Sequence, residues 1–106
     1  MKKKKHYRDT KAFIDELLKD PEIRIHYEEE RIRTEIAYAI RASRVKAGLT
    51  QVELAKKIDT TQSVIARLES GTDKRIPSLP LLAKIARACG AFLNFAFSFK
   101  KMARVH

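Results

Sequence analysis

Apolar residues recur at helical spacing over most of the chain, and capping residues divide the pattern into segments. Thr10 is placed to cap a first short helix, whose apolar side is formed by Phe13, Ile14, Leu17 and Leu18. The run Asp20-Pro21-Glu22 then supplies a cap, a proline at the first helical position and an acid in the first turn. It predicts a long charged helix that ends at Gly48 and carries Ile32, Ile36 and Ile40 at four-residue spacing.

Two short helices joined by a tight turn are predicted between Thr50 and Gly71. Thr50 and Glu53 form a capping box for the first helix, and Thr61 or Thr60 caps the second. The inward positions of the pair are Leu54, Ala55, Ile58, Val64, Ile65 and Leu68. A further helix starts after Ser78, has an apolar side around Leu82 and Ile85, and ends at Gly90. Two short helices that approach closely over a small residue such as Ala55 are typical of a helix-turn-helix.

The last segment changes to an alternation of apolar and polar residues. In FLNFAFSF, residues 92–99, the apolar positions Leu93, Phe95, Phe97 and Phe99 alternate with smaller or polar ones. A period of two predicts a half-buried β-strand, and the chain shows no second strand to pair with it. The simplest partner is the same strand of a second copy, so Leu93, Phe95 and Phe97 are candidate dimer residues.

Charge and composition narrow the function. The 106 residues include 23 Lys or Arg and 13 Asp or Glu, which gives a formal net charge of +10. This excess favours a polyanion, most often nucleic acid, although a solvated basic tail such as Lys2–Lys5 gives the same sign. No Cys/His cluster has zinc spacing, and neither a catalytic triad nor a phosphate-binding glycine loop is present. We therefore expect no enzyme activity and no cofactor.

The same features indicate where the protein acts. No apolar run is long enough to span a bilayer, so no membrane association is expected. The single Cys89 fits a reducing compartment. We therefore expect a cytoplasmic, nucleoid-associated protein.

The segments together predict a mainly α fold, a compact five-helix helix-turn-helix domain with an N-terminal helical arm and a C-terminal β-strand for dimerisation. We expect a basic tail and arm in residues 1–30, the DNA-binding domain in 31–91, and the dimerisation strand and tail in 92–106. In a helix-turn-helix the second helix lies in the major groove of DNA, with its early residues on base edges. Here those outward positions hold Gln62, Ser63 and Arg67.

About half of the chain, from Ile36 to Gly90, resembles the Cro/phage-repressor class of helix-turn-helix proteins, often called the XRE family. The resemblance is carried by Leu49-Thr50-Gln51, Glu53-Leu54-Ala55, Ile58, Thr61-Gln62, Ile65, Leu68-Glu69 and Gly71. It implies a bundle of about five helices that binds palindromic operators in double-stranded DNA as a homodimer.

The resemblance also implies residue roles. Gln62, Ser63 and Arg67 would read bases, whereas Gln51, Thr61, Lys74 and Arg75 would contact the DNA backbone or the minor groove. Arg44 and Glu69 match a partly buried ion pair that braces the family fold. Asp59 departs from the family pattern, in which many members have Gly.

The flanks of the domain resemble HigA-like antitoxins of type II toxin-antitoxin systems, which are partners of RelE/HigB-like toxins. On this hypothesis Phe13, Ile14, Leu17 and Leu18 bind the toxin, and the protein represses its own operon. The alternative for the apolar stripe is packing on its own domain. The alternative for the function is a stand-alone XRE-type transcription regulator with no toxin partner.

Overall fold

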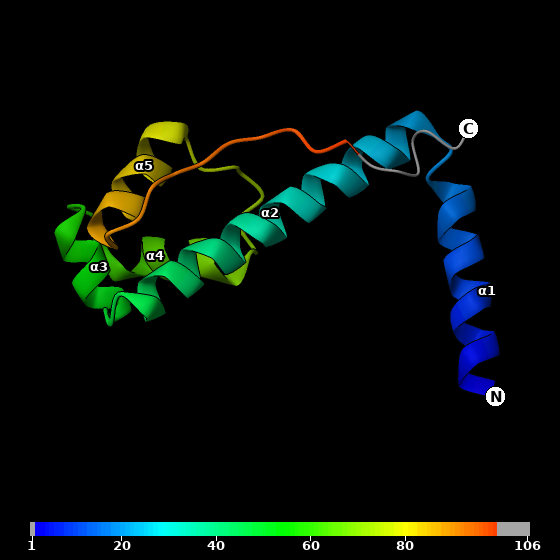
Figure 1. The fold of residues 1–106 in the computed structure, drawn as a ribbon, viewed down its shortest axis with the longest axis horizontal. Helices are drawn as coiled ribbons and strands as arrows, with labels where there is room; N and C mark the ends of the chain where they lie inside the picture. The colour runs from blue at the N-terminus through cyan, green and yellow to red at the C-terminus, as the bar shows by residue number, and fades with distance from the viewer. Residues whose placement is uncertain (1, 100–106) are drawn as a thin grey trace.

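A computed structural model of the chain describes residues 2–99. It contains five helices, α1 (Lys2–Leu17), α2 (Pro21–Lys46), α3 (Gln51–Lys57), α4 (Gln62–Ser70) and α5 (Leu79–Ala88). Helices α3, α4 and α5 gather around the C-terminal half of α2, while α1 and the first turns of α2 project away from them as an arm (Figure 1). The mainly α prediction with a helix-turn-helix at its centre is therefore confirmed, but the predicted five helices of the compact domain are wrong, because among the described residues only α2, α3, α4 and α5 pack together and α1 belongs to the arm.

Side-chain caps fix the starts of four helices at the predicted residues. Asp20 accepts a hydrogen bond from the backbone of α2, and Ser78 accepts one from the backbone of α5. Thr50 forms the predicted capping box with Glu53, with distances of 3.0 and 2.8 Å. Thr61, rather than Thr60, caps α4. These interactions satisfy amide groups that an uncapped helix leaves without a partner.

The first helix begins earlier than the sequence pattern predicted. Thr10 was expected to cap a short helix, but it lies inside α1, which starts at Lys2. The lysine run ahead of it contains no Gly or Pro, and lysine has a good helix propensity, so nothing local stops the helix. The predicted start at Thr10 is therefore wrong.

Two positions with positive φ shape the compact end. Asp59, in the turn between α3 and α4, has φ 61°, a conformation that Asp tolerates better than most residues other than glycine. Gly71 ends α4 with φ 72°, and a Cβ built there would lie 3.6 Å from the Cβ of Ala37. Glycine therefore relieves the strain at this turn, where α4 leaves the domain towards the loop.

The core is small and lies where α2, α3, α4 and α5 meet. Leu54 and Ile65 are fully buried, and they are surrounded by Ile40, Ala55, Ile58 and Ile85. Ala55 is 2% exposed, so its small side chain lies directly between neighbouring helices. Five of these six residues were predicted to face inward from helical spacing, and the sixth, Ile40, belongs to the repeat of isoleucines on α2.

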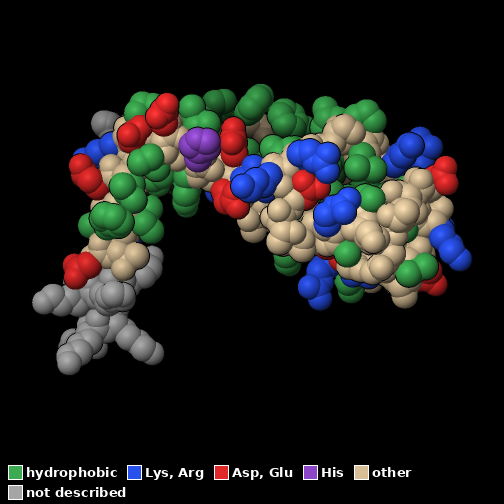
Figure 2. Space-filling model, turned by 180° about the vertical axis from the view of Figure 1, so that it is seen from behind, with side chains coloured by type: hydrophobic (Ala, Val, Ile, Leu, Met, Phe, Trp, Pro, Cys, Tyr) green, Lys and Arg blue, Asp and Glu red, His purple; other side chains and the backbone are tan. Residues whose placement is uncertain are grey.

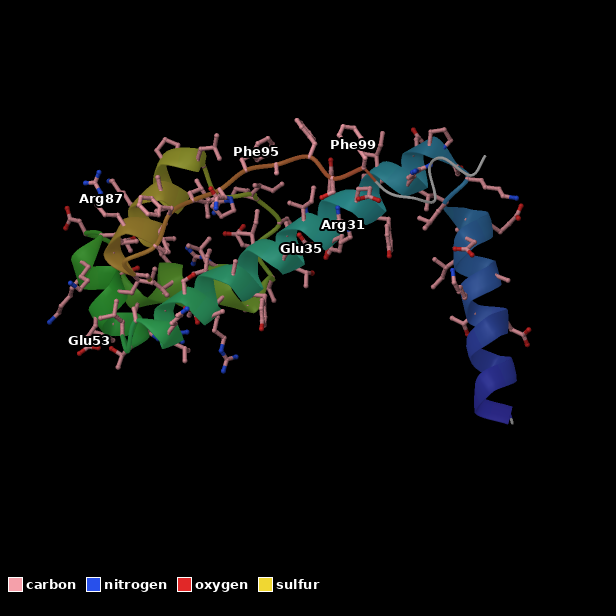
Figure 3. All side chains as sticks on the ribbon, viewed as in Figure 1. Arg31, Glu35, Glu53, Arg87, Phe95 and Phe99 are labelled. Atoms are coloured by element: carbon pink, nitrogen blue, oxygen red, sulfur yellow. The ribbon has the colours of Figure 1, made fainter. Side chains whose placement is uncertain are left out.

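The predicted C-terminal β-strand is wrong. Residues 91–99 run as an extended segment back along α2, and the described part of the chain contains no strand (Figure 1). A strand needs a neighbouring backbone, and no described backbone hydrogen bond involves residues 92–99. The period-two spacing still brings alternate residues together, because the rings of Phe95 and Phe97 pack edge to face with centroids 5.2 Å apart. Phe95 and Phe99 project from the segment and are 78% and 90% exposed (Figure 3).

The arm is held by local interactions rather than by a core. Arg31 pairs with Glu28 at 3.0 Å and with Glu35 at 2.6 Å along α2 (Figure 3). Such pairs contribute about 0.2–0.5 kcal/mol each. The apolar stripe of α1 stays open to solvent, with Phe13 64% exposed and Ile14 39% exposed. The alternative that this stripe packs on its own domain is therefore wrong for the described chain.

One polar contact joins α2 to α4 across the core. Arg44 donates from Nε to Oε2 of Glu69 at 2.6 Å and from Nη2 to Oε1 at 3.0 Å. Its Nη1 also donates to the carbonyl of Leu49 at 2.7 Å. The two side chains are only 13% and 5% exposed. The hydrogen bonds that Arg44 donates to Glu69 raise the pKa of Arg44. Burial alone would raise the pKa of Glu69, but hydrogen bonds from Arg44 and Gln51 outweigh it and lower the pKa.

We expect Glu69→Gln to destabilise the fold by on the order of 3 kcal/mol, because it leaves the partly buried charge of Arg44 without a counter-charge. Urea unfolding at pH 7 measures the change in the free energy of unfolding. The matched control is Glu35→Gln, which removes an exposed pairing of Arg31 and should cost about 0.5 kcal/mol or less.

The lowered pKa of Glu69 also predicts how the stability difference between wild type and Glu69→Gln changes with pH. A carboxylate with a lowered pKa in the folded state stabilises above its unfolded pKa, about 4.3, and the contribution is lost as the pH falls through the folded value. The difference between wild type and Glu69→Gln should therefore shrink in acid. Equal stability of the two proteins at pH 7 would contradict the role of this pair.

Candidate nucleic-acid interface

The start of α4 forms an exposed polar surface. Gln62 is the first residue of the helix, and Thr61, Gln62 and Ser63 are all exposed. Ile65 and Leu68 on the other side of α4 pack into and against the core. The helix therefore presents its first residues outward while its apolar side is held by α2 and α3, as insertion into a major groove requires.

A chain of hydrogen bonds connects this surface to the core. Gln62 Nε2 donates to Gln51 Oε1 at 2.8 Å. Gln51 Nε2 donates in turn to Glu69 Oε1 at 3.1 Å, and Glu69 is held by Arg44. The chain thus passes from the first residue of α4 through the first residue of α3 to the ion pair. Sequence reasoning assigned roles to all four residues but did not foresee that they are linked.

Arg67 lies apart from Gln62, beside the loop that follows α4. Its side chain is 53% exposed, and Nε is 3.8 Å from Oδ2 of Asp73. Asp73 also accepts hydrogen bonds from the backbone N of Arg75 at 3.1 Å and from its Nε at 3.4 Å. The backbone bond and the side-chain bond from Arg75 lower the pKa of Asp73. Asp73 therefore organises the two arginines, a role that the sequence did not reveal because the loop reads as simply basic.

The loop is also braced from α2. Arg33 donates from Nη1 to the carbonyl of Lys74 at 3.2 Å and pairs with Glu30 on its own helix. Lys74 and Arg75 remain exposed, and the side chain of Arg75 is 84% accessible. Arg33 is 41 positions from Lys74 in sequence, so no local signal could have indicated this contact.

The predicted residues fall into two groups on the compact end of the molecule. Gln51, Thr61, Gln62 and Ser63 lie at the starts of α3 and α4, and Arg67, Lys74 and Arg75 surround Asp73. The predicted toxin and dimer residues belong to neither group, since they lie on α1, in the turn after it and in the extended segment.

The positive charge is concentrated at this end. Residues 36–99 contain 10 basic and 4 acidic residues, a net charge of +6, whereas residues 1–35 contain 10 basic and 9 acidic residues, so the excess at this end does not come from the N-terminal tail. Among the side chains coloured by type in Figure 2, Lys and Arg are spread over the compact end, whereas acidic ones are more frequent on the coloured part of the arm. This distribution suits a polyanion at the helix-turn-helix rather than at the arm.

Neither a membrane span nor a metal site is found in the described part of the chain. No helix among residues 2–99 is long and apolar enough to cross a bilayer. Within the same residues, His, Cys, Asp and Glu form no group of three or more that could hold a metal ion.

The chain is similar to known proteins over its helix-turn-helix. It is 44% identical over 65 residues to Multiprotein-bridging factor 1a of Arabidopsis thaliana, which is 61% of this chain and 44% of that protein. It is 43% identical to human Endothelial differentiation-related factor 1 over 65 residues, which is 61% of this chain and 43% of that protein. The matched region therefore spans less than half the length of these relatives.

An archaeal relative is covered more fully. An uncharacterized HTH-type transcriptional regulator of Archaeoglobus fulgidus is 47% identical over 60 residues, which is 57% of this chain and 83% of that protein. No solved structure matches the chain. Residues 40–91 match the sequence model of a family described as helix-turn-helix. The match includes the end of α2 and all of α3, α4 and α5, and the chain belongs to the helix-turn-helix family.

Proposed function

We propose that this protein is a sequence-specific transcription regulator that places α4 in the major groove of operator DNA. The observation that carries the proposal is Gln62, which is exposed at the start of α4 and tied to the core through Gln51 and Glu69. A side chain that reads a base edge gains specificity when its position is fixed before binding. The family to which the chain belongs and the net charge of its compact end support the same function.

Two sets of side chains have different tasks in this proposal. Gln62, Ser63 and Arg67 read bases, and Arg67 can donate two hydrogen bonds to the O6 and N7 edge of guanine. The exposed Lys74 and Arg75, on the loop braced by Arg33, neutralise phosphates or enter the minor groove. Gln51 and Thr61, at the starts of α3 and α4, contact the DNA backbone.

We also propose a homodimer, because a palindromic operator presents two equal half-sites. Leu93, Phe95 and Phe97 are exposed on the extended segment, and Phe95 is 78% exposed. Burial of such rings between two copies contributes on the order of 2 kcal/mol each. The contact proposed here is between side chains and needs no strand in the single chain.

The role of the arm separates two forms of the proposal. A stand-alone regulator is favoured, because the relatives named above are described as a transcriptional regulator, a bridging factor and a differentiation-related factor, and none as an antitoxin. The antitoxin remains a second candidate because the stripe containing Phe13, Ile14 and Leu17 is open to solvent and suits a protein partner. Its partner would be a RelE/HigB-like toxin.

Substitution of a base-reading residue and substitution of a phosphate-binding residue should change DNA affinity in different ways. We expect Arg67→Ala to lose about 1–3 kcal/mol per half-site at its own base and to relax discrimination there. Lys74→Ala should weaken binding to all sequences about equally and lower the salt slope by about one. Binding to an operator selected from random sequences, and to its single-base variants, is measured across a salt series. The assignment fails if Arg67→Ala weakens operator and random DNA to the same extent.

We expect Phe95→Asp to convert the dimer to monomer, because a charged side chain cannot be buried between two copies without a partner. Operator binding should fall steeply with it, since the half-sites would no longer be held at fixed spacing. Sedimentation measures the mass, and Phe13→Asp on the arm is the control. A stable dimer of Phe95→Asp would place the interface elsewhere.

Deleting residues 1–30 tests the second candidate. If the protein is an antitoxin, the truncated chain should no longer protect cells from its cognate toxin, because the apolar stripe of α1 is gone, while specific DNA binding stays mostly intact. Growth on toxin co-expression and operator binding are measured side by side. Full protection by the truncated chain would show that the arm is not the inhibitory element.

A further inference from the structure

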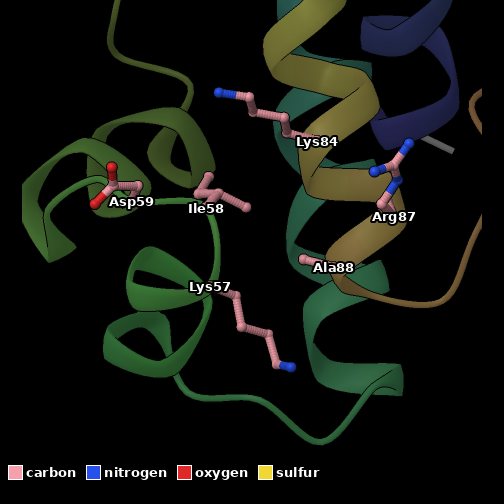
Figure 4. A pocket seen from close by; sticks show the side chains of 6 residues that line it. All are labelled: Lys57, Ile58, Asp59, Lys84, Arg87 and Ala88. Carbon is pink, nitrogen blue, oxygen red and sulfur yellow. The ribbon is translucent and has the colours of Figure 1, made fainter.

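An open cleft of about 440 Å³ lies between the C-terminal end of α3 and α5. It is lined by Lys57, Ile58, Asp59, Lys84, Arg87 and Ala88 (Figure 4). Lys57 is the last residue of α3, at the opposite end of that helix from Gln51. We call this feature the basic cleft. It shares no residue with the candidate nucleic-acid interface.

Three cations without acidic partners border the basic cleft. Lys57, Lys84 and Arg87 are exposed, and none takes part in an ion pair found among the described residues. The carboxylate of Asp59 points away from α5, whereas the side chain of Lys84 extends towards the gap (Figure 4). Arg31 and Arg44, by contrast, are paired with glutamates. The local charge of the basic cleft is therefore left for a partner to neutralise.

The cleft also has an apolar base. Ile58 is buried at 8% exposure, and Ala88 is half-buried beside it. The volume lies within the range of about 300–1,000 Å³ typical of pockets that enclose ligands. Cations around an apolar base match a segment that carries both acidic and apolar side chains. A DNA duplex presents its phosphates on a convex surface and has nothing to place against Ile58.

A second copy of the chain is a poor occupant. Its main acidic cluster, Glu28 to Glu30, lies beside cations of the same helix, and Glu28 and Glu30 form ion pairs with Arg31 and Arg33. We propose that the basic cleft binds an acidic segment of a different protein, with an apolar side chain on Ile58 and Ala88 and carboxylates on the three cations. Because the cleft and α4 use different residues, the protein can hold this partner while it is bound to DNA.

The test uses a fluorescein-labelled peptide of twelve residues that alternates Asp-Glu pairs with Leu, together with the same peptide carrying Asn-Gln pairs. Fluorescence anisotropy measures its affinity for the full chain. The triple variant Lys57→Glu, Lys84→Glu, Arg87→Glu should bind the acidic peptide about tenfold more weakly or worse. The matched control reverses Lys11, Lys19 and Arg24 on the arm, which changes the net charge equally, and should bind within about twofold of wild type.

The location is checked by NMR on the wild-type chain, which does not depend on how well any variant folds. Amide shifts caused by the peptide should centre on residues 57–59 and 84–88. Three results would overturn the proposal: equal loss of binding in both triple variants, equal binding of the uncharged peptide, or shifts centred on α4. Displacement of the peptide by a short DNA duplex, with duplex-induced shifts at residues 84–88, would make the cleft a nucleic-acid contact instead.

Discussion

The geometry of the surface at the start of α4 depends on the bidentate contact between Arg44 and Glu69. Helix α4 has nine residues, too few to be stable alone, so its position is set by what holds it. Arg44 engages both carboxylate oxygens of Glu69, and one of them also accepts from Gln51. Rotation or translation of α4 would break these bonds at a partly buried site, where water replaces them less easily than at the surface. The same contact therefore fixes α2, α3 and α4 relative to one another and determines the position of the Gln62 side chain.

Around this fixed centre, apolar side chains are distributed unevenly. Only seven residues of the described chain form the buried apolar core, and all lie in the compact end. The arm and the extended segment instead expose large apolar residues, among them Phe13, Ile25 and Phe97. Local ion pairs are enough to keep the arm helical, but they give these side chains no apolar surroundings. Both flanks are thus suited to contacts with other chains, while the domain between them is complete in itself.

The sequence predicted those parts of the fold that local interactions determine. The caps at Asp20, Thr50 and Ser78 depend on residues two or three positions away, and so they could be read directly. The predicted β-strand was wrong because strand pairing needs a neighbouring backbone, and a pattern of alternating residues does not show whether one is present. The candidate site divides in the same way. Outward positions on α4 follow from helical spacing, whereas the roles of Asp73 and Arg33 arise only when the loop folds against α4 and α2.

The positive charge of the chain does not by itself select a partner; selectivity depends on the local shape of the surface. Residues 36–99 carry a net charge of +6, and by charge alone any polyanion would be attracted to every part of the compact end. A projecting helix such as α4 can enter a groove, and in the proposed complex Gln62 and Arg67 would meet base edges that differ from one sequence to another. The basic cleft beside Lys84 and Arg87 has room for side chains, as proposed, but its volume of about 440 Å³ is too small to enclose a duplex. Salt would weaken both proposed contacts, yet discrimination between bases could arise only at the projecting surface, so charge would attract partners and local shape would decide which of them is bound.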